Sequence, residues 1–301
     1  MQENSLQAVV VGAGTMGTTL AKLMAAQGVK VIVLDTSQRV LEASRLSMGE
    51  NFATVCFTTE FKAEYRPDFV IESVTENTEI KQKVIAQIES NVADTTIIMT
   101  NTSGIPIDEI ARKMRVPQRF LGAHFFNPAD IIPAVEVVPG SQTESFFLET
   151  ACRWLKQLGK RPVVLKTCVP GFVANRIQHA IMRECLSLLE KGVVEAKDLD
   201  EIVQYSIGVR MALNGPLCQR DLNGLDTHLH IARYLYPDLD ASDKPAALLE
   251  DYVAQGRLGA KVGQGFYSWS DASRAQHQAK ERENLQLIIE IAKRNGCQEK
   301  S

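Results

Sequence analysis

The first half of the chain alternates between two hydrophobic patterns. Short runs rich in β-branched residues, typical of buried strands, alternate with segments whose apolar residues recur every three or four positions, as in amphipathic helices. This alternation predicts a twisted, mostly parallel sheet with helices on both faces, which is a doubly wound α/β fold. The predicted strands are residues 9–11, 29–34, 52–57, 69–74, 95–100, 120–124, 134–138 and 162–165.

The pattern changes at Val169-Pro170-Gly171, beyond which strand-like runs are nearly absent. A long helix is expected to begin at Pro170 and to end near residue 191. We therefore expect two domains, residues 1–169 with the sheet and residues 170–301 with helices alone. Further helical patterns cover residues 195–206, 222–236, 245–255 and 271–295.

A glycine-rich turn follows the first predicted strand. Gly12, Gly14 and Gly17 form the sequence G-x-G-x-x-G, which leads into an apolar helical segment and then into a strand that ends at Asp35. This order is typical of a dinucleotide-binding Rossmann unit, which has a strand, a glycine turn, a helix, a second strand and an acidic residue. Gly12 permits the tight turn, Gly14 lets the backbone approach a pyrophosphate, and Gly17 lets the helix pack closely on the strand.

The residues beside these glycines indicate which dinucleotide binds. Thr15 and Met16 begin the helix, so their backbone N–H groups and the positive end of the helix dipole face the phosphates. Asp35 can accept hydrogen bonds from both ribose hydroxyls, and its charge would repel a 2′-phosphate. We therefore expect NAD rather than NADP, although Arg39 is a cation that could turn towards a phosphate. A purely structural glycine turn is the alternative.

Composition gives no reason to expect a macromolecular ligand. The 301 residues are 45% hydrophobic and 23% charged, which is ordinary for a globular protein of about two domains. The 33 basic and 36 acidic residues give a net charge of −3, so nothing favours nucleic acid or an anionic membrane as a partner. No apolar run is long enough to span a bilayer, and we expect a small-molecule substrate.

The cysteines and histidines predict neither disulfides nor a metal site. The six cysteines are scattered, form no C-x-x-C pair and follow a short polar N-terminus without a signal peptide, so we expect reduced thiols in a cytoplasmic protein. His228 and His230 form a close pair, but they lack partners at metal-ligand spacing and are expected on a helix surface.

Several polar residues stand at or near the ends of predicted strands, where ligands bind in doubly wound sheets. Glu72, Asn101 and His124 lie at three such ends, and Glu136 lies within the next strand. A histidine beside a nicotinamide can take the hydroxyl proton of an alcohol while a neighbouring glutamate fixes the imidazole and stabilises its charged form. The alternative from spacing alone is a histidine that only packs in the core.

Five segments resemble the L-3-hydroxyacyl-CoA dehydrogenase family. They occur in the order expected for that family between residues 8 and 269, so the resemblance covers nearly the whole chain. The segments are Asn101-Thr102-Ser103, Gly122–Pro128 with Ala134–Val138, Pro170–Arg176, Gly215–Asp226 and Gly263–Tyr267.

The resemblance implies roles for matching positions. His124 would be the general acid and base, with Glu136 as its partner. Ser103 would bind the substrate oxygen near the nicotinamide, and Asn175 would reach the same site from the second domain. The cofactor would contact Glu76 and Lys81, which stand in the spacing E-x-x-x-x-K, and also Asn101. The resemblance also implies a homodimer formed through the helical domain.

The chain departs from the fatty-acid-oxidising members of this family in two segments. Residues 36–68 are too few for the helical arm that helps to cover coenzyme A in those members. Ala129–Ala134 and Ser206–Arg210 resemble instead the branches that act on small free acids of the carnitine, gulonate and pyridine-carboxylate type. In that case Arg210 could pair with a substrate carboxylate, and a solvated helix-end arginine is the alternative.

The sequence therefore predicts an NAD-dependent oxidoreductase of the 3-hydroxyacyl-CoA dehydrogenase type. Such an enzyme oxidises a secondary alcohol β to a carbonyl. The first alternative keeps this chemistry and replaces the acyl-CoA with a small free hydroxy acid or a related carboxylate. The second alternative is a protein that binds NAD without catalysis.

Overall fold

The computed structural model of the chain describes residues 6–49, 52 and 55–294. The chain divides into two compact units, residues 1–175 and residues 176–301, and each is described by itself. The predicted domain boundary at residues 169 and 170 stays a prediction.

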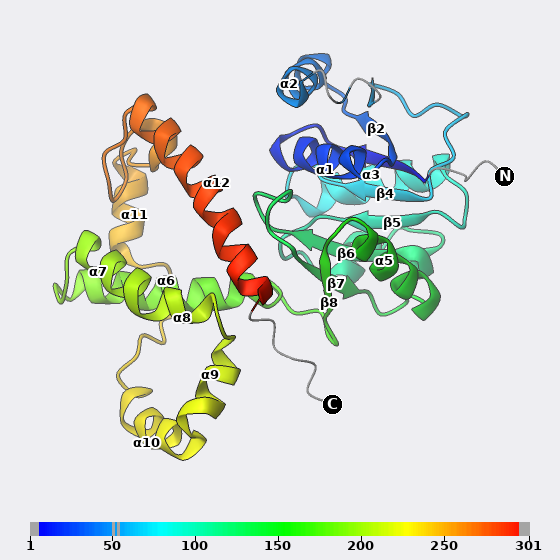
Figure 1. Cartoon of the computed structure of the whole chain (residues 1–301). Coiled ribbons are helices and arrows are strands. Elements are labelled where there is room, and N and C mark those ends of the chain that lie inside the picture. The colour runs from blue at the N-terminus through cyan, green and yellow to red at the C-terminus, as the bar shows by residue number, and fades with distance from the viewer. Residues whose placement is uncertain (1–5, 50–51, 53–54, 295–301) are drawn as a thin grey trace. The chain divides into compact units, whose positions relative to one another are not determined.

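The first unit contains one eight-stranded sheet (Figure 1) with the order β3-β2-β1-β4-β5-β6-β7-β8. All neighbouring strands are parallel except β6 and β7, so β7 and β8 run against the other six. Part of the predicted strand at residues 52–57 lies outside the described residues. The strands are β1 Gln7–Val11, β2 Lys30–Leu34, β3 Cys56–Thr58, β4 Phe69–Glu72, β5 Ile97–Thr100, β6 Phe120–Phe125, β7 Ala134–Pro139 and β8 Arg161–Val164.

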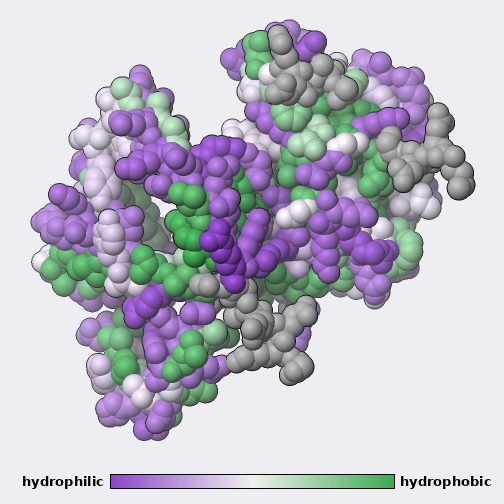
Figure 2. All heavy atoms as spheres, in the orientation of Figure 1, coloured by the Kyte–Doolittle hydropathy of each residue, from purple (hydrophilic) through white to green (hydrophobic). Residues whose placement is uncertain are grey.

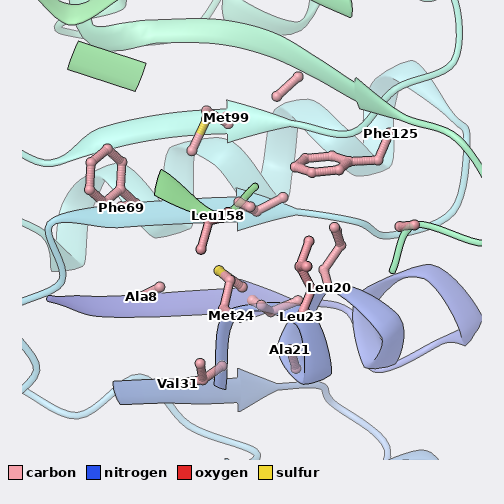
Figure 3. Packing of buried hydrophobic residues seen from close by; sticks show 14 of the residues in the cluster. Ala8, Leu20, Ala21, Leu23, Met24, Val31, Phe69, Met99, Phe125 and Leu158 are labelled. Atoms are coloured by element: carbon pink, nitrogen blue, oxygen red, sulfur yellow. The ribbon is translucent and has the colours of Figure 1, made fainter. Parts of the chain in front are cut away.

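Helices cover both faces of this sheet because successive strand residues point to opposite sides. One apolar cluster joins Ala8 and Val10 of β1 to α1 and α5, and the other joins Val9 and Val11 to α3 and α4. Figure 3 shows Leu20 and Met24 of α1 in the first cluster. The doubly wound fold is therefore confirmed. The helices are α1 Thr15–Ala26, α2 Gln38–Met48, α3 Thr78–Asn91, α4 Ile107–Ala111 and α5 Ser145–Gln157, with a 3₁₀ turn η2 at Pro117–Arg119.

The second unit is helical, as predicted, and its described residues form only isolated β-bridges. None of the described helices is long and apolar enough to cross a membrane. Helix α6, Ala174–Glu190, begins with the last two residues of the first unit and continues into the second. The other elements of the second unit are α7 Ala196–Ile202, the π-helix η3 Val203–Gly208, α8 Val209–Met211, α9 Pro216–Asn223, α10 Leu225–Leu235, α11 Ala247–Ala254, the 3₁₀ turn η4 Ala260–Val262 and α12 Asp271–Arg294.

The long helix α6 begins four residues later than predicted, at Ala174 rather than Pro170. Gly171 and Phe172 have φ angles of 74° and 51°, which lie in the left-handed region and are incompatible with a right-handed helix. Residues 170–173 therefore form a turn that ends in the N-terminus of α6. This turn places the first N–H groups of the helix beside the site described below.

Candidate active site

The glycine turn between β1 and α1 is shaped as its sequence predicts. A Cβ on Gly12, whose φ is +102°, would lie 2.5 Å from the carbonyl oxygen of Ser73, and a Cβ on Gly17 would lie 1.8 Å from that of Gly12. A Cβ on Gly14 would meet nothing within 4 Å. Gly12 and Gly17 are thus required by the packing of the protein, whereas Gly14 leaves space open in front of the backbone.

This open space lies at the N-terminus of α1. Thr15 and Met16 are the first two residues of the helix, and Gly14 provides no side chain that could cap it. The first N–H groups of a helix lack partners within the helix and carry its positive dipole end, so they favour a negatively charged ligand. The turn therefore fits a bound pyrophosphate.

A cavity of about 780 Å³ adjoins the turn. Gly12 and Gly14 line it together with Asp35, the residue after β2. Asp35 Oδ2 accepts a hydrogen bond from Ala13 N and Oδ1 accepts one from Ser37 N, both at 2.9 Å. The carboxylate is fixed at the cavity wall, where it retains lone pairs for ribose hydroxyls. The residues present fit a dinucleotide.

A buried lysine connects two glutamates at the carboxyl end of β4. Lys81 and Glu72 are fully buried, and Lys81 Nζ lies 2.8 Å from Glu72 Oε1 and 3.3 Å from Glu76 Oε2. Glu72 also accepts hydrogen bonds from Thr100 Oγ1 at 2.6 Å and Val74 N at 2.7 Å. The charges of this cluster are paired and hydrogen-bonded, as buried charges must be.

Glu76 links this cluster to Ser103. Glu76 Oε1 accepts hydrogen bonds from Thr102 Oγ1 at 2.6 Å, Ser103 N at 2.8 Å and Ser103 Oγ at 3.1 Å. Partial burial alone would raise the pKa of Glu76, but the hydrogen bond from Thr102 and the charge of Lys81 outweigh it, so the pKa lies below its ordinary value. Glu76 is therefore an anion that holds the backbone and hydroxyl of Ser103.

The carboxamide of Asn101 connects the ends of neighbouring strands. Asn101 follows β5, its Oδ1 accepts a hydrogen bond from Phe125 N at 2.9 Å, and its Nδ2 lies 3.5 Å from Ser73 Oγ. The side chain thus fixes the residues that follow β4 and β5 against the end of β6.

His124 and Glu136 form a buried hydrogen-bonded pair. They face each other in the antiparallel register of β6 and β7, and His124 Nδ1 lies 2.8 Å from Glu136 Oε2. Each residue is only 6% exposed, and the ring of Phe126 lies 4.6 Å from the imidazole, centroid to centroid. With Nδ1–H donating to the carboxylate, the imidazole has its remaining lone pair on Nε2.

The other oxygen of Glu136 binds the start of α6. Glu136 Oε1 accepts hydrogen bonds from Val173 N at 2.9 Å and Ala174 N at 3.0 Å. Two backbone donors and the helix dipole stabilise the charged carboxylate. The turn at residues 170–173 therefore holds Glu136 in the orientation that fixes His124.

Asn175 lies one residue further along α6 and reaches the serine segment. Its Nδ2 donates to the carbonyl oxygen of Ser103 at 2.8 Å. Gly104 permits this approach, because a Cβ there would lie 2.9 Å from Gly171 N. The first unit thus joins Glu76, Ser103 and Asn175 in one hydrogen-bonded chain, and His124 and Glu136 in another that also ends at the start of α6.

Arg210 lies in α8 of the helical unit, two residues after the end of the π-helix η3. Its Nε donates to the carbonyl oxygen of Ser206 at 2.9 Å, and its side chain is exposed. π-Helical turns occur frequently at functional sites. The predicted contact of Arg210 with a substrate carboxylate stays a prediction.

Some contributors to the site were not predicted from the sequence. The sequence places Glu72 at a strand end but predicts neither its pairing with Lys81 nor the role of Thr102 as a donor to Glu76. A carboxylate that ends the apolar run Phe69-Val70-Ile71 must be buried and needs a cation, which is the signal that could have found Lys81.

Comparison with known families shows to which family the chain belongs. A model of the NAD-binding domain of 3-hydroxyacyl-CoA dehydrogenase matches residues 7–55 and 43–168, and a model of the C-terminal domain of the same enzyme matches residues 171–269. The chain belongs to the 3-hydroxyacyl-CoA dehydrogenase family. This confirms the family, the fold and the NAD cofactor that the sequence predicts, and the chain is an NAD-dependent oxidoreductase of this family.

Two curated relatives are similar to this chain over different shares of their own length. The 5-formyl-3-hydroxy-2-methylpyridine 4-carboxylate 5-dehydrogenase of Mesorhizobium japonicum is 33% identical over 298 residues, which cover 94% of this chain and 96% of the relative. The fatty acid oxidation complex subunit alpha of Acinetobacter baylyi is 34% identical over 284 residues, which cover 87% of this chain but 39% of that protein. The chain thus spans well under half of the second relative.

Two solved structures of the family resemble the chain to different degrees. A 5-formyl-3-hydroxy-2-methylpyridine 4-carboxylic acid 5-dehydrogenase, described as an NAD⁺-dependent dismutase, has a TM-score of 0.91 at 31% identity and covers 96% of this chain and 99% of its own. The (S)-3-hydroxybutyryl-CoA dehydrogenase of Ralstonia eutropha has a TM-score of 0.73 at 32% identity and covers 89% of this chain and 100% of its own.

Proposed function

We propose that this member of the family oxidises a secondary alcohol β to a carbonyl, as 3-hydroxyacyl-CoA dehydrogenases do, and that His124 is its general base. The observation that carries the proposal is the buried pair of His124 Nδ1 and Glu136 Oε2 at 2.8 Å. A histidine held at one nitrogen by a carboxylate presents the other nitrogen as a base. NAD, when bound, accepts the hydride.

In this proposal the proton moves from the substrate hydroxyl to Nε2 of His124. The imidazolium that forms is stabilised by Glu136, which is itself held by the backbone N–H groups of Val173 and Ala174. The hydrogen bonds support this division of roles. Both oxygens of Glu136 already accept hydrogen bonds, so Glu136 orients His124 while His124 takes the proton. In the reverse reaction His124 returns the proton to the carbonyl oxygen.

Ser103 and Asn175 are proposed to bind the substrate beside His124. The substrate hydroxyl has one proton, which points at Nε2 of His124, so Ser103 and Asn175 would donate hydrogen bonds to the substrate oxygen. The Ser103 hydroxyl would turn away from Glu76 Oε1, which keeps its bonds from Thr102 Oγ1 and Ser103 N, and Asn175 Nδ2 has a second N–H beside the one that it donates to Ser103 O. Both groups would orient the alcohol so that its proton faces the imidazole.

The cofactor is proposed to lie along the edge formed by the carboxyl ends of β1, β2, β4 and β5. Its pyrophosphate would sit on the turn Gly12–Gly17 and the N–H groups of Thr15 and Met16, with the adenosine ribose on Asp35. The nicotinamide half would approach Glu76 and Asn101, whereas the fully buried Lys81 would act through its pairing with Glu76.

A direct assay tests this function. The purified protein is mixed with NAD⁺ and (S)-3-hydroxybutyryl-CoA, and in the reverse direction with NADH and acetoacetyl-CoA, while the absorbance of NADH is followed. We expect turnover in both directions. If NAD⁺ binds in a calorimeter but neither acyl-CoA reacts, the acyl-CoA substrate is excluded.

The second candidate keeps the site and replaces the acyl-CoA with a small carboxylate. Between β2 and β4 the helix and strand given by the described residues are α2 and the three-residue β3, and these residues include no longer helical arm of the kind expected to cover coenzyme A. The pyridine-carboxylate dehydrogenase is similar over its full length and has the higher TM-score of the two structures above. These observations favour a substrate of that chemical class, an aromatic or hydroxy carboxylate.

Arg210 provides the test between the two candidates. A guanidinium can bind a carboxylate in bidentate fashion. If the substrate is a free acid, Arg210→Ala should raise KM for that acid about 10-fold or more, in keeping with the loss of a charge-assisted pair, while the KM for NAD⁺ stays constant. Unchanged kinetics on every free acid would exclude Arg210 as the carboxylate ligand.

A protein that binds NAD without catalysis is the remaining alternative. It would bind NAD⁺ but produce no NADH with any acyl-CoA or free acid. The complete set of Ser103, His124, Glu136 and Asn175 argues against it, because a protein that only binds NAD needs no oriented base and no groups that position an alcohol.

We further propose that the chain forms a homodimer through its helical unit. Among the described residues of this unit, only Leu186 and Leu199 are buried apolar side chains. Large apolar side chains are exposed instead, and Figure 2 shows green patches over these helices. Exposed apolar surface on this scale marks a protein interface. A cytoplasmic location stays a prediction from the sequence.

A further inference from the structure

The residues that follow β3 form a second wall of the cofactor cavity, apart from the glycine turn. Strand β3 pairs with β2 so that Thr58 lies opposite Leu34, and Asp35 N donates to Thr58 O at 3.3 Å. The two strands therefore end side by side, about 4.8 Å apart. The residues that follow them, Asp35 after β2 and Glu60 after β3, both line the cavity.

The backbone of Glu60 is fixed in this position. Thr58 Oγ1 donates to Glu60 O at 3.0 Å and accepts from Glu60 N at 3.2 Å. The next residue, Phe61, also lines the cavity, and its ring packs edge-on against buried Tyr65 at 5.9 Å. Glu60 therefore stands on a structured wall, although its own side chain is exposed.

Two carboxylates line the cavity where the adenosine ribose would lie, and a cation follows four residues after the first of them. Asp35 is fixed by hydrogen bonds from Ala13 N and Ser37 N, and Glu60 adds a second negative charge on the adjacent wall. Arg39, in the first turn of α2, is the cation that would favour a phosphate. A 2′-phosphate carries close to two negative charges at neutral pH, so each carboxylate acts against it.

We propose that Glu60 is a second specificity-determining residue, which acts with Asp35 to exclude NADP from this cavity and outweighs Arg39. Asp35 binds the ribose hydroxyls that NAD presents, whereas Glu60 acts by charge on the phosphate that only NADP carries. The inference rests on the proposed function only in that the cavity must bind the adenosine half of the dinucleotide.

The role of Glu60 predicts that the segment after β3 sets cofactor selectivity. Replacing Asp35 alone would leave one carboxylate facing the phosphate, so the selectivity for NAD⁺ would be reduced but not lost. Removing the charge of Glu60 alone should shift selectivity towards NADP⁺ while Asp35 still holds the ribose.

Binding of dinucleotides without substrate tests the proposal. The full-length protein and its Glu60→Gln variant are titrated with NAD⁺ and with NADP⁺ in a calorimeter, at about 20 mM and at about 500 mM NaCl, because salt screens exposed charges. The matched control is Glu64→Gln, which removes the same charge from the same exposed segment but outside the cavity lining.

The ratio of the two dissociation constants, Kd for NADP⁺ over Kd for NAD⁺, is the readout. Glu60→Gln should lower this ratio about 5-fold at low salt and less than about 2-fold at high salt, as expected for a charge several ångströms away in a high dielectric. Glu64→Gln should leave the ratio unchanged.

A ratio for Glu60→Gln that equals the wild-type ratio at low salt, or an equal gain in Glu64→Gln, would overturn the role of Glu60. Those outcomes leave the proposed dehydrogenase intact as long as the wild type binds NAD⁺. A wild type that binds neither dinucleotide would overturn both proposals.

Discussion

Glu136 is the residue that connects the chemistry to the fold. One oxygen orients His124 and the other accepts two backbone hydrogen bonds at the start of α6. Glu136→Gln keeps the shape but removes the charge that stabilises the imidazolium, so kcat should fall about 100-fold or more, within the range that general acid–base groups contribute. The measurement is the steady-state rate of NADH formation at saturating NAD⁺.

Glu149→Gln is the matched control for this prediction, because Glu149 is an exposed carboxylate on α5. It should retain the wild-type kcat. If Glu136→Gln were as active as this control, Glu136 would not be the partner of the base.

Glu76 predicts a pH dependence of stability. Its pKa in the folded protein lies below the ordinary value of 4.5, so ionised Glu76 stabilises the fold above that pH and this contribution is lost as the pH falls through the lowered pKa. The urea midpoint of Glu76→Gln should therefore be lower than that of the wild type at pH 7, and the difference should shrink below about pH 4.5.

Circular dichroism during urea titrations between about pH 3.5 and pH 8 measures this difference. A difference that is the same over the whole range would show that the charge of Glu76 is not its source.

For single residues, the sequence predicts pairs of side chains on neighbouring strands better than it predicts larger hydrogen-bond networks. His124 and Glu136 could be predicted as partners because they lie on strands that were recognised as neighbours. The bonds from Val173 and Ala174 to Glu136 could not, because they depend on the left-handed turn at Gly171 and Phe172. That turn follows from packing rather than from local periodicity.

At the scale of elements, the glycine turn separates two kinds of requirement. Gly17→Ala would place a Cβ 1.8 Å from Gly12 O, so α1 would have to move off β1, at a cost of about 3 kcal/mol. Gly14→Ala meets nothing within 4 Å, and its φ of −67° and ψ of −172° suit alanine, so it should cost less than about 1 kcal/mol.

Gly17→Ala should affect mainly stability, and Gly14→Ala should affect mainly the binding of NAD⁺. Gly17→Ala should lower the melting temperature by several degrees, whereas Gly14→Ala should melt near the wild type but bind NAD⁺ at least about 10-fold more weakly, because its methyl group fills space meant for the pyrophosphate. Thermal melts and calorimetry measure both. Unimpaired NAD⁺ binding by Gly14→Ala would show that the dinucleotide does not approach this backbone.

Most elements of the first unit could be predicted, because strands buried on both faces and amphipathic helices have distinct periods. Element ends were less predictable. The run at residues 69–74 pairs only through Glu72, after which the chain turns to bring Val74 N and Lys81 to the Glu72 carboxylate. The observed strand is therefore two residues shorter than the predicted run, and the residues beyond it surround the Glu72 carboxylate.

At the scale of the whole molecule, the helical unit predicts self-association. Its exposed apolar side chains include Leu217 at 81%, Leu222 at 72% and Tyr205 at 71% of their full accessibility. Light scattering after size-exclusion chromatography should therefore give twice the chain mass of 33.3 kDa. A single-chain mass at micromolar concentration would contradict the dimer. The sequence could predict the helices but not which of their faces would be covered.

The variant His124→Gln tests whether His124 is the base of this NAD-dependent dehydrogenase. Glutamine retains hydrogen bonding but cannot take the proton. With the substrate that the assays identify, kcat should fall about 1,000-fold or more while the Kd for NAD⁺ changes little, and His230→Gln on α10 should behave as the wild type. A His124→Gln enzyme whose kcat stayed close to that of the wild type would show that His124 is not the base.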